Sequence, residues 1–180
     1  MTSIFGCSNR LKFERYSSKD PELNLAMDFV SGWLYSEHRG EKSSYAGVVF
    51  YENKKGDVPK ALIGLTVRTE SKVKLEPKTT EAFAEDIISK RRKFKEMELL
   101  SKSYGKFSGI DAVNIIMSYK ISDKLYGANA KLISAKERVV VLKKNDKFYT
   151  IRYENTAKEF NKFDKAFSHI LDSIDFKDNK

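Results

Sequence analysis

The chain has 180 residues, a net charge of +9 and a single cysteine, and 41% of its residues are hydrophobic. This hydrophobic content excludes a disordered protein and suits one folded domain with an ordinary core. One cysteine cannot form an internal disulfide or build a thiolate zinc site, and no apolar run approaches the roughly 18 to 20 residues that span a bilayer.

The first part of the chain is predicted to form strands after an extended lead-in. A short first strand is expected within residues 10–20. The next segment alternates between apolar and polar positions, which predicts a half-buried strand whose apolar face holds Leu23, Leu25, Met27 and Phe29. A polar, glycine-containing break should then lead into two strands with a hairpin-like connection: residues 45–52 and 61–70, joined by 53–60.

A helix is predicted over residues 79–95. Thr79 or Thr80 can cap its N-terminus, and acidic residues in its first turns suit the positive end of the helix dipole. The apolar residues Phe83, Ile87 and Phe94 should share one face.

The second half of the chain predicts four more strands and a final helix. The strands are expected within residues 97–104, 109–121, 131–144 and 147–154, with a tight turn at Asn145-Asp146. The final helix has one apolar stripe, formed by Phe160, Phe163, Phe167, Ile170, Leu171 and Ile174. Short links between strands favour antiparallel pairing, and the two helices could cover one face of the sheet or both.

Three segments carry a resemblance to a known family. They are "MDFVSGWLY" with its Gly32-Trp33 corner, "GKFSGIDAVNIIMSYK", and "DKFYTIRYENTAKEFNKFDKAFSHILDSIDF". The chain resembles the PsbP family and the related Mog-like and DcrB-like proteins from about Tyr16 to Phe176, although Val30-Ser31 stands where the family usually has a proline. The resemblance implies an α+β fold, an α-β-α sandwich with a central, mainly antiparallel sheet flanked by helices. It also implies one domain over residues 16–176, after a tether at 1–15 and before a tail at 177–180.

The resemblance implies binding roles more than a chemical reaction. Family members of photosynthetic organisms assist photosystem II, bacterial relatives are envelope proteins, and Mog-like relatives act on a small GTPase. The matching segments are packing motifs, and a shared fold does not carry function across. No metal-binding residue of the family can be matched to this chain, so we expect no metal site, no cofactor and no enzymatic activity.

Cys7 is predicted to be a lipid attachment site. "Ile4-Phe5-Gly6-Cys7" resembles a bacterial lipobox, in which a small residue precedes the cysteine that receives lipid, although Phe5 is bulkier than usual. Cys7 also lies just before the folded segment, where a lipidated N-terminus belongs. This interpretation requires a signal sequence upstream of residue 1 in the precursor, and a buried or idle cysteine is the alternative.

The basic cluster Lys90, Arg91, Arg92, Lys93 and Lys95 is the second candidate site. A solvated helix end matched to the helix dipole explains it most simply. The functional interpretation is contact with an acidic partner or with lipid headgroups. No recognised nucleic-acid-binding motif accompanies the cluster, so we expect no nucleic-acid partner.

The two histidines offer no catalytic or metal-binding spacing. His169 falls opposite the apolar stripe of the last helix, and His38 lies in a mixed-charge segment near Glu37 and Glu41. We therefore expect a monomeric, lipid-anchored envelope protein that binds, or helps to assemble, a protein complex whose identity the sequence leaves open. A soluble cytosolic Mog-like adaptor is the alternative, and a small-ligand or metal carrier with a pocket beneath aromatic strands is a third.

Overall fold

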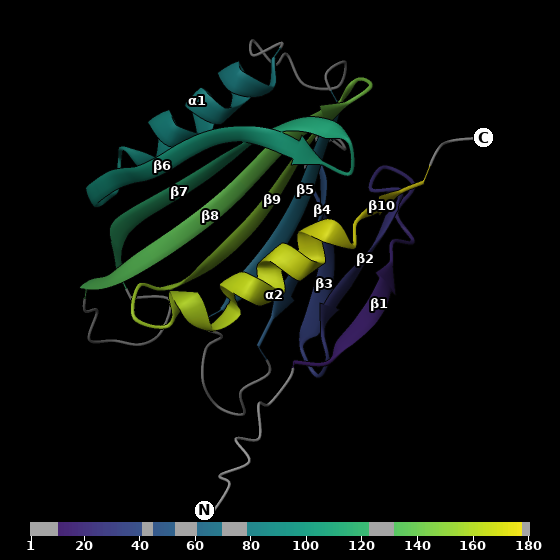
Figure 1. The fold of residues 1–180 in the computed structure, drawn as a ribbon, viewed down its shortest axis with the longest axis horizontal. Helices are drawn as coiled ribbons and strands as arrows, with labels where there is room; N and C mark the ends of the chain where they lie inside the picture. The colour runs from purple at the N-terminus through teal and green to yellow at the C-terminus, as the bar shows by residue number, and fades with distance from the viewer. Residues whose placement is uncertain (1–10, 41–44, 53–60, 70–78, 123–131, 178–180) are drawn as a thin grey trace, which may run out of the picture.

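A computed structural model describes residues 11–40, 45–52, 61–69, 79–122 and 132–177. The largest sheet contains β3 (Leu34–Arg39), β4 (Ala46–Tyr51), β5 (Leu62–Thr69), β6 (Lys95–Phe107), β7 (Ile110–Ser122), β8 (Leu132–Lys144) and β9 (Lys147–Thr156). These seven strands lie in the order β3-β4-β5-β9-β8-β7-β6, and every neighbouring pair is antiparallel (Figure 1). The β5–β9 pairing joins the two halves of the chain in one sheet.

A small sheet and the C-terminal helix pack on one face of the large sheet. The small sheet has the order β1-β2-β10 and contains β1 (Phe13–Ser17), β2 (Leu25–Val30) and β10 (Asp175–Phe176), and the helix is α2 (Phe160–Asp172). Phe29 of β2 stacks on Phe50 of β4 with ring centroids 5.1 Å apart. Trp33 meets Phe163 of α2 edge-on at 5.2 Å, so both elements share one hydrophobic core with the sheet.

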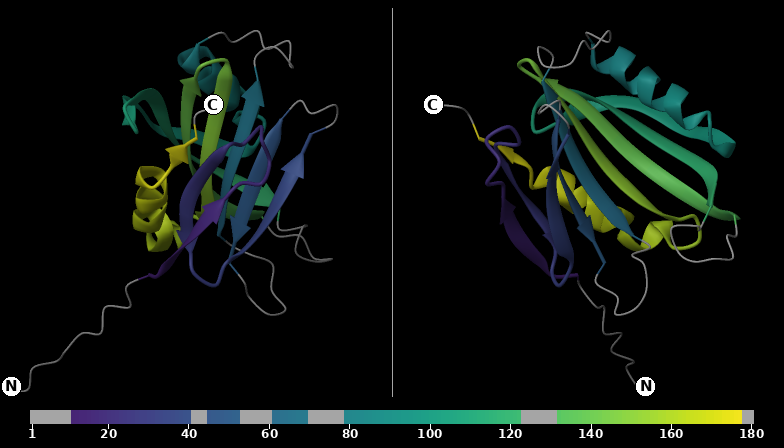
Figure 2. Two further views of the ribbon diagram at one scale, coloured as in Figure 1. Left: turned by 90° about the vertical axis from the view of Figure 1, so that its right-hand side faces the viewer. Right: turned by 180° about the vertical axis from the view of Figure 1, so that it is seen from behind.

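The other helix, α1 (Thr80–Arg91), lies on the opposite face (Figure 2). The Thr79 side chain caps it by accepting a hydrogen bond from the Ala82 backbone N–H at 3.1 Å. Phe83 is buried and stacks on Phe148 of β9 at 4.9 Å. Alternate residues of β8 therefore serve two cores, with Val139 on the α1 side and Val140 on the α2 side.

Two turns use backbone conformations that favour glycine. At the corner after β2, the Trp33 N–H donates to the Val30 carbonyl at 3.1 Å and Gly32 has φ of +79°. The β6–β7 hairpin turns at Ser108 and Gly109, which both have positive φ, as tight hairpins require.

The structure confirms the predicted fold class. The sheet is antiparallel and the two helices cover opposite faces, while the three-stranded sheet is an addition to the expected sandwich. The first strand expected within residues 10–20, the strands expected at 45–52 and 61–70 and the four strands expected in the second half are present. The Thr79 cap and the turn at Asn145-Asp146 are present as well. Among the described residues, no helix has both the length and the apolar character that crossing a bilayer needs.

Three expectations about local structure are wrong. The polar segment after Trp33 forms β3 at the edge of the large sheet. Strand β2 is buried on both faces except at Asp28, because it is the central strand of the small sheet and also contacts α2. Helix α1 ends at Arg91, so Phe94 lies in the following turn, where it stacks on Tyr119 at 5.0 Å.

Candidate functional site

Strands β5 and β9 carry a polar strip on the face that α1 covers. Thr66 of β5 lies directly opposite Thr150 of β9, and Gly64 lies opposite Arg152. Arg68 belongs to the same strip because every second residue of a strand points to the same face. Two threonine hydroxyls are therefore flanked by an arginine on either side.

Helix α1 closes this strip into a cavity of about 170 Å³. Phe83, Asp86, Ile87, Lys90 and Arg91 line it from the helix side. Lys90 Nζ lies 2.6 Å from Asp86 Oδ2, so these two charges balance each other. At about 30 Å³ per water molecule, the cavity has room for a carboxylate or phosphate group and a few waters.

A buried carboxylate beneath the cavity holds two of the arginines. Glu137 of β8 has no exposed surface, and its Oε2 accepts from Arg91 Nε at 2.7 Å while its Oε1 accepts from Arg91 Nη2 at 3.0 Å. Arg152 Nε donates to Glu137 Oε1 at 2.5 Å, and Arg152 Nη2 donates to Glu154 Oε2 at 3.3 Å. The Tyr119 hydroxyl lies 3.1 Å from Glu137 and 3.0 Å from Glu154, which completes the network.

The network keeps one charge state at neutral pH. Burial by itself would raise the pKa of Glu137, but hydrogen bonds and charge from Arg91 and Arg152 outweigh it and hold that pKa below its usual value. Burial would lower the pKa of Arg91, yet Glu137 raises it overall. Burial, and then the charges of Glu137 and Glu154, raise the pKa of Tyr119, so its hydroxyl stays protonated. Arg91 is therefore a fixed cation.

Arg68 supplies the charge that this network does not neutralise. Its guanidinium carbon lies 5.9 Å from the ring centroids of Tyr45 and Phe83, and no carboxylate within the described ranges forms an ion pair with it. Within the part of the chain that the structure describes, four cations and three carboxylates at the site leave one positive charge in excess. Fixed guanidinium groups beside two hydroxyls are suited to binding an oxyanion.

The predicted basic cluster divides between this cavity and the surface. Lys90 and Arg91 line the cavity, whereas Arg92 and Lys93 are exposed beyond the helix end and Lys95 is the exposed first residue of β6. Cys7, the predicted lipid attachment site, lies outside the described residues, as do Glu41 and the connection at 53–60.

Sequence reasoning missed Arg68 and Arg152. Each lies two residues beyond a threonine in a strand, in "TVR" and "TIR", so the two segments present the same Thr-x-Arg pattern. That repetition was the available signal. It gains meaning only from the β5–β9 pairing, which places Thr66 directly opposite Thr150, so that Arg68 and Arg152 lie on either side of the two threonines.

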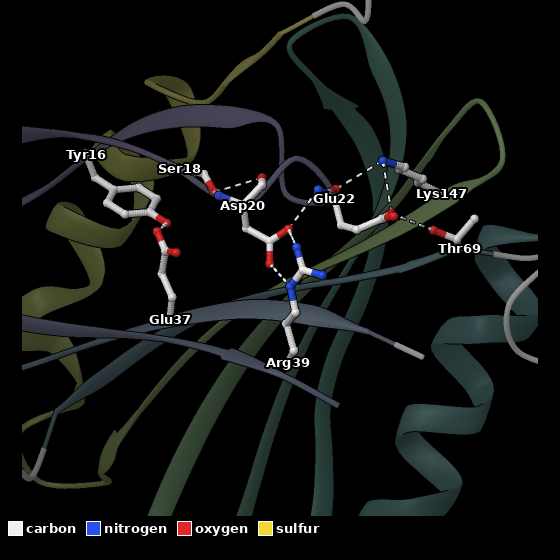
Figure 3. Close-up of polar contacts among 8 residues, drawn as sticks. All are labelled: Tyr16, Ser18, Asp20, Glu22, Glu37, Arg39, Thr69 and Lys147. Carbon is white, nitrogen blue, oxygen red and sulfur yellow. Dashed lines mark hydrogen bonds and ion pairs between the residues drawn. The ribbon is translucent and has the colours of Figure 1, made fainter. Parts of the chain in front are cut away.

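A second polar cluster joins the small sheet to the large one (Figure 3). Arg39 of β3 donates from Nε and Nη2 to the two Asp20 carboxylate oxygens at 2.6 and 2.7 Å. Nearby, Lys147 Nζ donates to the Glu22 carbonyl oxygen at 3.1 Å and lies 3.6 Å from its carboxylate. The side chains in this cluster bind one another, so we assign it a role in holding the layers together.

The histidines serve packing and surface contacts. His38 lies on β3, and its Nε2 would be 2.5 Å from a Cβ added at Gly47. His169 is exposed, as expected, with Nε2 3.0 Å from Asp28 Oδ2 and its ring 4.0 Å from that of Phe13. The described residues contain no cluster of three or more histidine, cysteine or acidic side chains arranged to hold a metal ion.

Comparison with known proteins identifies similar structures but no sequence relative. No protein-family model and no curated protein matches the chain. Cyanobacterial PsbP (CyanoP) from Synechocystis sp. is similar with a TM-score of 0.60 and 14% identity, over 97% of this chain and 98% of that one. The Ran-binding protein Mog1p of Saccharomyces cerevisiae has a TM-score of 0.55 and 10% identity, over 94% and 97% of the two chains.

A third similar structure is LpqN of Mycobacterium tuberculosis, which is described as involved in cell envelope biogenesis. Its TM-score is 0.54 at 15% identity, over 94% of this chain and 93% of LpqN. At such low identities the shared property is the fold, and function does not follow from it. The chain has the PsbP/Mog-like fold.

Proposed function

We propose that this protein is a non-catalytic binding protein of the cell envelope. A lipid on Cys7 would hold it at the membrane, and the cavity beneath α1 would hold an acidic group of a protein partner. The charge arrangement of the cavity supports this role most directly. Arg68 retains an unneutralised charge among the described residues, beside Arg152 and two threonine hydroxyls.

The position of α1 favours a protein partner over lipid headgroups. In all three views α1 lies at the opposite end of the molecule from the start of β1, the strand that follows the proposed anchor (Figures 1 and 2). A basic site at the opposite end from the start of β1 is better placed to meet a partner away from the membrane than to touch the bilayer.

Anchoring by lipid does not require the basic surface. Each buried methylene contributes about 0.8 kcal/mol, and one acyl chain alone holds only marginally. Bacterial lipoproteins carry two or three chains, which suffice for stable attachment. The net charge of +9 is then available for recognition of acidic partners.

Acylation is tested by expressing the full precursor in a bacterial host. We expect lipid on the Cys7 peptide by mass spectrometry and the protein in the membrane fraction, both lost in Cys7→Ala. An unmodified peptide and soluble protein from the unaltered precursor would contradict the anchor.

Acidic-group binding is tested separately, by fluorescence anisotropy with a labelled glutamate-containing peptide. Arg68→Gln should weaken binding about tenfold or more, because it removes a cation that no carboxylate of the described residues pairs with. Lys165→Gln removes an exposed charge of α2 on the other face of the sheet and is the matched control. Equal losses in the two variants would mean that only net charge attracts the peptide.

A soluble adaptor is the second candidate, because a Ran-binding protein shares the fold. This role needs no lipid and would use the same cavity for an acidic surface of its partner. The genomic sequence upstream of residue 1 separates the two: a basic and apolar leader supports the anchored form, and a stop codon with a ribosome-binding site supports the adaptor.

A further inference from the structure

A small apolar hollow adjoins the cationic cavity on the same face of the sheet. Val49, Leu62 and Gly64 line it together with Arg152 and Glu154, and its volume is about 80 Å³. Arg152 borders both spaces. Val49, Gly64 and Arg152 form one row across β4, β5 and β9, next to the row of the two threonines.

The hollow exists because residue 64 has no side chain. A Cβ at Gly64 would meet only Val49 Cγ2 at 3.8 Å and the Val48 carbonyl at 4.0 Å, which are ordinary contacts. Gly47 in the neighbouring strand differs, because His38 fills the space above it. A glycine inside a strand weakens it and marks a place where a ligand or another backbone comes close. The chain fills the space at Gly47 itself and leaves the space at Gly64 open.

Polarity changes along the surface from one row to the next. Arg68 lies at one end, the threonine row and the Gly64–Arg152 row follow, and Leu62 and Glu154 face each other at the other end. An acidic group therefore belongs over the threonine row, between Arg68 and Arg152, and an apolar group belongs near Gly64. The two groups should not exchange places, because Glu154 would repel a carboxylate in the hollow.

The spacing of the rows matches an extended polypeptide. Residues two apart in a strand lie about 6.7 Å from each other on one face, in this sheet and in an extended ligand alike. Arg68 lies two rows from Gly64, and the threonine row lies between them. An acidic side chain over the threonine row, between Arg68 and Arg152, then places the side chain two residues away over Gly64. The volume of the hollow suits a small apolar side chain such as valine.

We infer that this surface binds an extended segment of a partner protein that carries an acidic residue and a small apolar residue two positions apart. The inference rests on the proposed function, because it takes the acidic group to bind in the cationic cavity. A free phosphate or carboxylate ion would fill the cavity alone and leave the hollow empty.

The test uses the full chain and three labelled peptides in fluorescence anisotropy. The first contains Glu-Gly-Val in a glycine-serine frame, the second replaces Val with Gly, and the third replaces Glu with Gln. Wild type should bind the first about five- to tenfold more tightly than the second, from burial of the valine side chain. The third should bind at least tenfold more weakly than the first.

Three variants assign the contacts. Gly64→Val fills the hollow and should bring the affinity for the valine peptide down to that for the glycine peptide, without changing the latter. Gly64→Ala introduces only ordinary contacts and should give a smaller loss of affinity for the valine peptide. It replaces Gly64→Val in the test if that variant does not fold. Arg68→Gln should weaken the binding of both glutamate-containing peptides.

The outcomes separate the inference from the proposed function. If the valine and glycine peptides bind equally while Arg68→Gln weakens both, the inference is overturned and the acidic-group site stands. If no glutamate peptide binds in an Arg68-dependent way, the proposed function fails first. If inorganic phosphate binds as tightly as the valine peptide, the site takes a small anion and the extended-segment inference is overturned.

Discussion

Arg91, the last residue of α1, forms a two-point ion pair with Glu137 in the middle of β8, at 2.7 and 3.0 Å. Glu137 is fully buried, and 19% of the Arg91 side chain is exposed. The pair fixes the C-terminal end of α1 on the sheet. It thereby holds α1 over the β5–β9 strip, so that the helix forms one side of the cavity. Arg152 of β9, on the sheet side of the cavity, donates to the same carboxylate.

Removing the Glu137 carboxylate should destabilise the fold strongly. Glu137→Ala leaves Arg91 and Arg152 without their shared counter-charge, and breaking a buried pair in this way costs about 3 to 5 kcal/mol. The free energy of unfolding from urea denaturation measures the loss. Glu85→Gln, which disturbs an exposed pair with Lys102, should cost less than about 1 kcal/mol. Comparable losses in the two variants would show that the buried network does not stabilise the protein.

The Asp20–Arg39 pair should contribute to acid sensitivity. Burial by itself raises the pKa of Asp20, but hydrogen bonds from Arg39 and from the Glu22 backbone N–H outweigh it and lower that pKa below 3.8. A carboxyl with a lowered folded-state pKa gives stability that is present above pH 3.8 and is lost as the pH falls through the folded-state value.

Urea denaturation of wild type and Asp20→Asn between pH 7 and pH 2 measures this contribution. Asp20→Asn should be less stable than wild type near neutral pH, and the difference should shrink below about pH 4. A difference that stays constant through the acid range would show that the Asp20 charge is not involved.

The two glycines of β4 and β5 should respond in opposite ways to alanine. Gly47→Ala drives a methyl group into His38, at 2.5 Å, and against the Leu65 carbonyl, at 3.0 Å, which should cost about 1 to 3 kcal/mol. Gly64→Ala has room and should be neutral or stabilising by up to about 1 kcal/mol.

Thermal unfolding of both variants measures this contrast. His38→Ala combined with Gly47→Ala should recover part of the loss, because it removes the side chain that occupies the space. A Gly47→Ala protein as stable as wild type would mean that His38 does not pack there.

Trp33 should report on the docking of α2. It is the single tryptophan of the chain, it is 8% exposed, and it packs on Phe163. Phe163→Ala should cost about 3 to 5 kcal/mol, and the Trp33 emission of the folded variant should shift to longer wavelength as water reaches the ring. Phe176→Ala, at a partly buried position against Tyr149, should leave that emission unchanged.

The elements best predicted from the sequence are those whose burial follows a simple period. The apolar stripe from Phe160 to Leu171 correctly predicted α2, because a surface helix needs one apolar face to pack on a sheet. β3 was not predicted because it is a mostly exposed edge strand, and its sequence lacks the apolar alternation that indicates a half-buried strand. The end of α1 was misplaced because the basic run continues past Arg91 while the backbone turns into β6.

The sequence by itself determined the antiparallel α+β fold, the capped first helix and a basic end to that helix. Tertiary structure decided what the basic residues do. It turns Arg91 inward to Glu137, leaves Arg92 and Lys93 in solvent, and pairs β5 with β9 so that Arg68 and Arg152 line one cavity under α1. Local periodicity records which face of an element is buried. Which strands become neighbours depends on contacts between residues far apart in the chain, and the candidate site is made of such contacts.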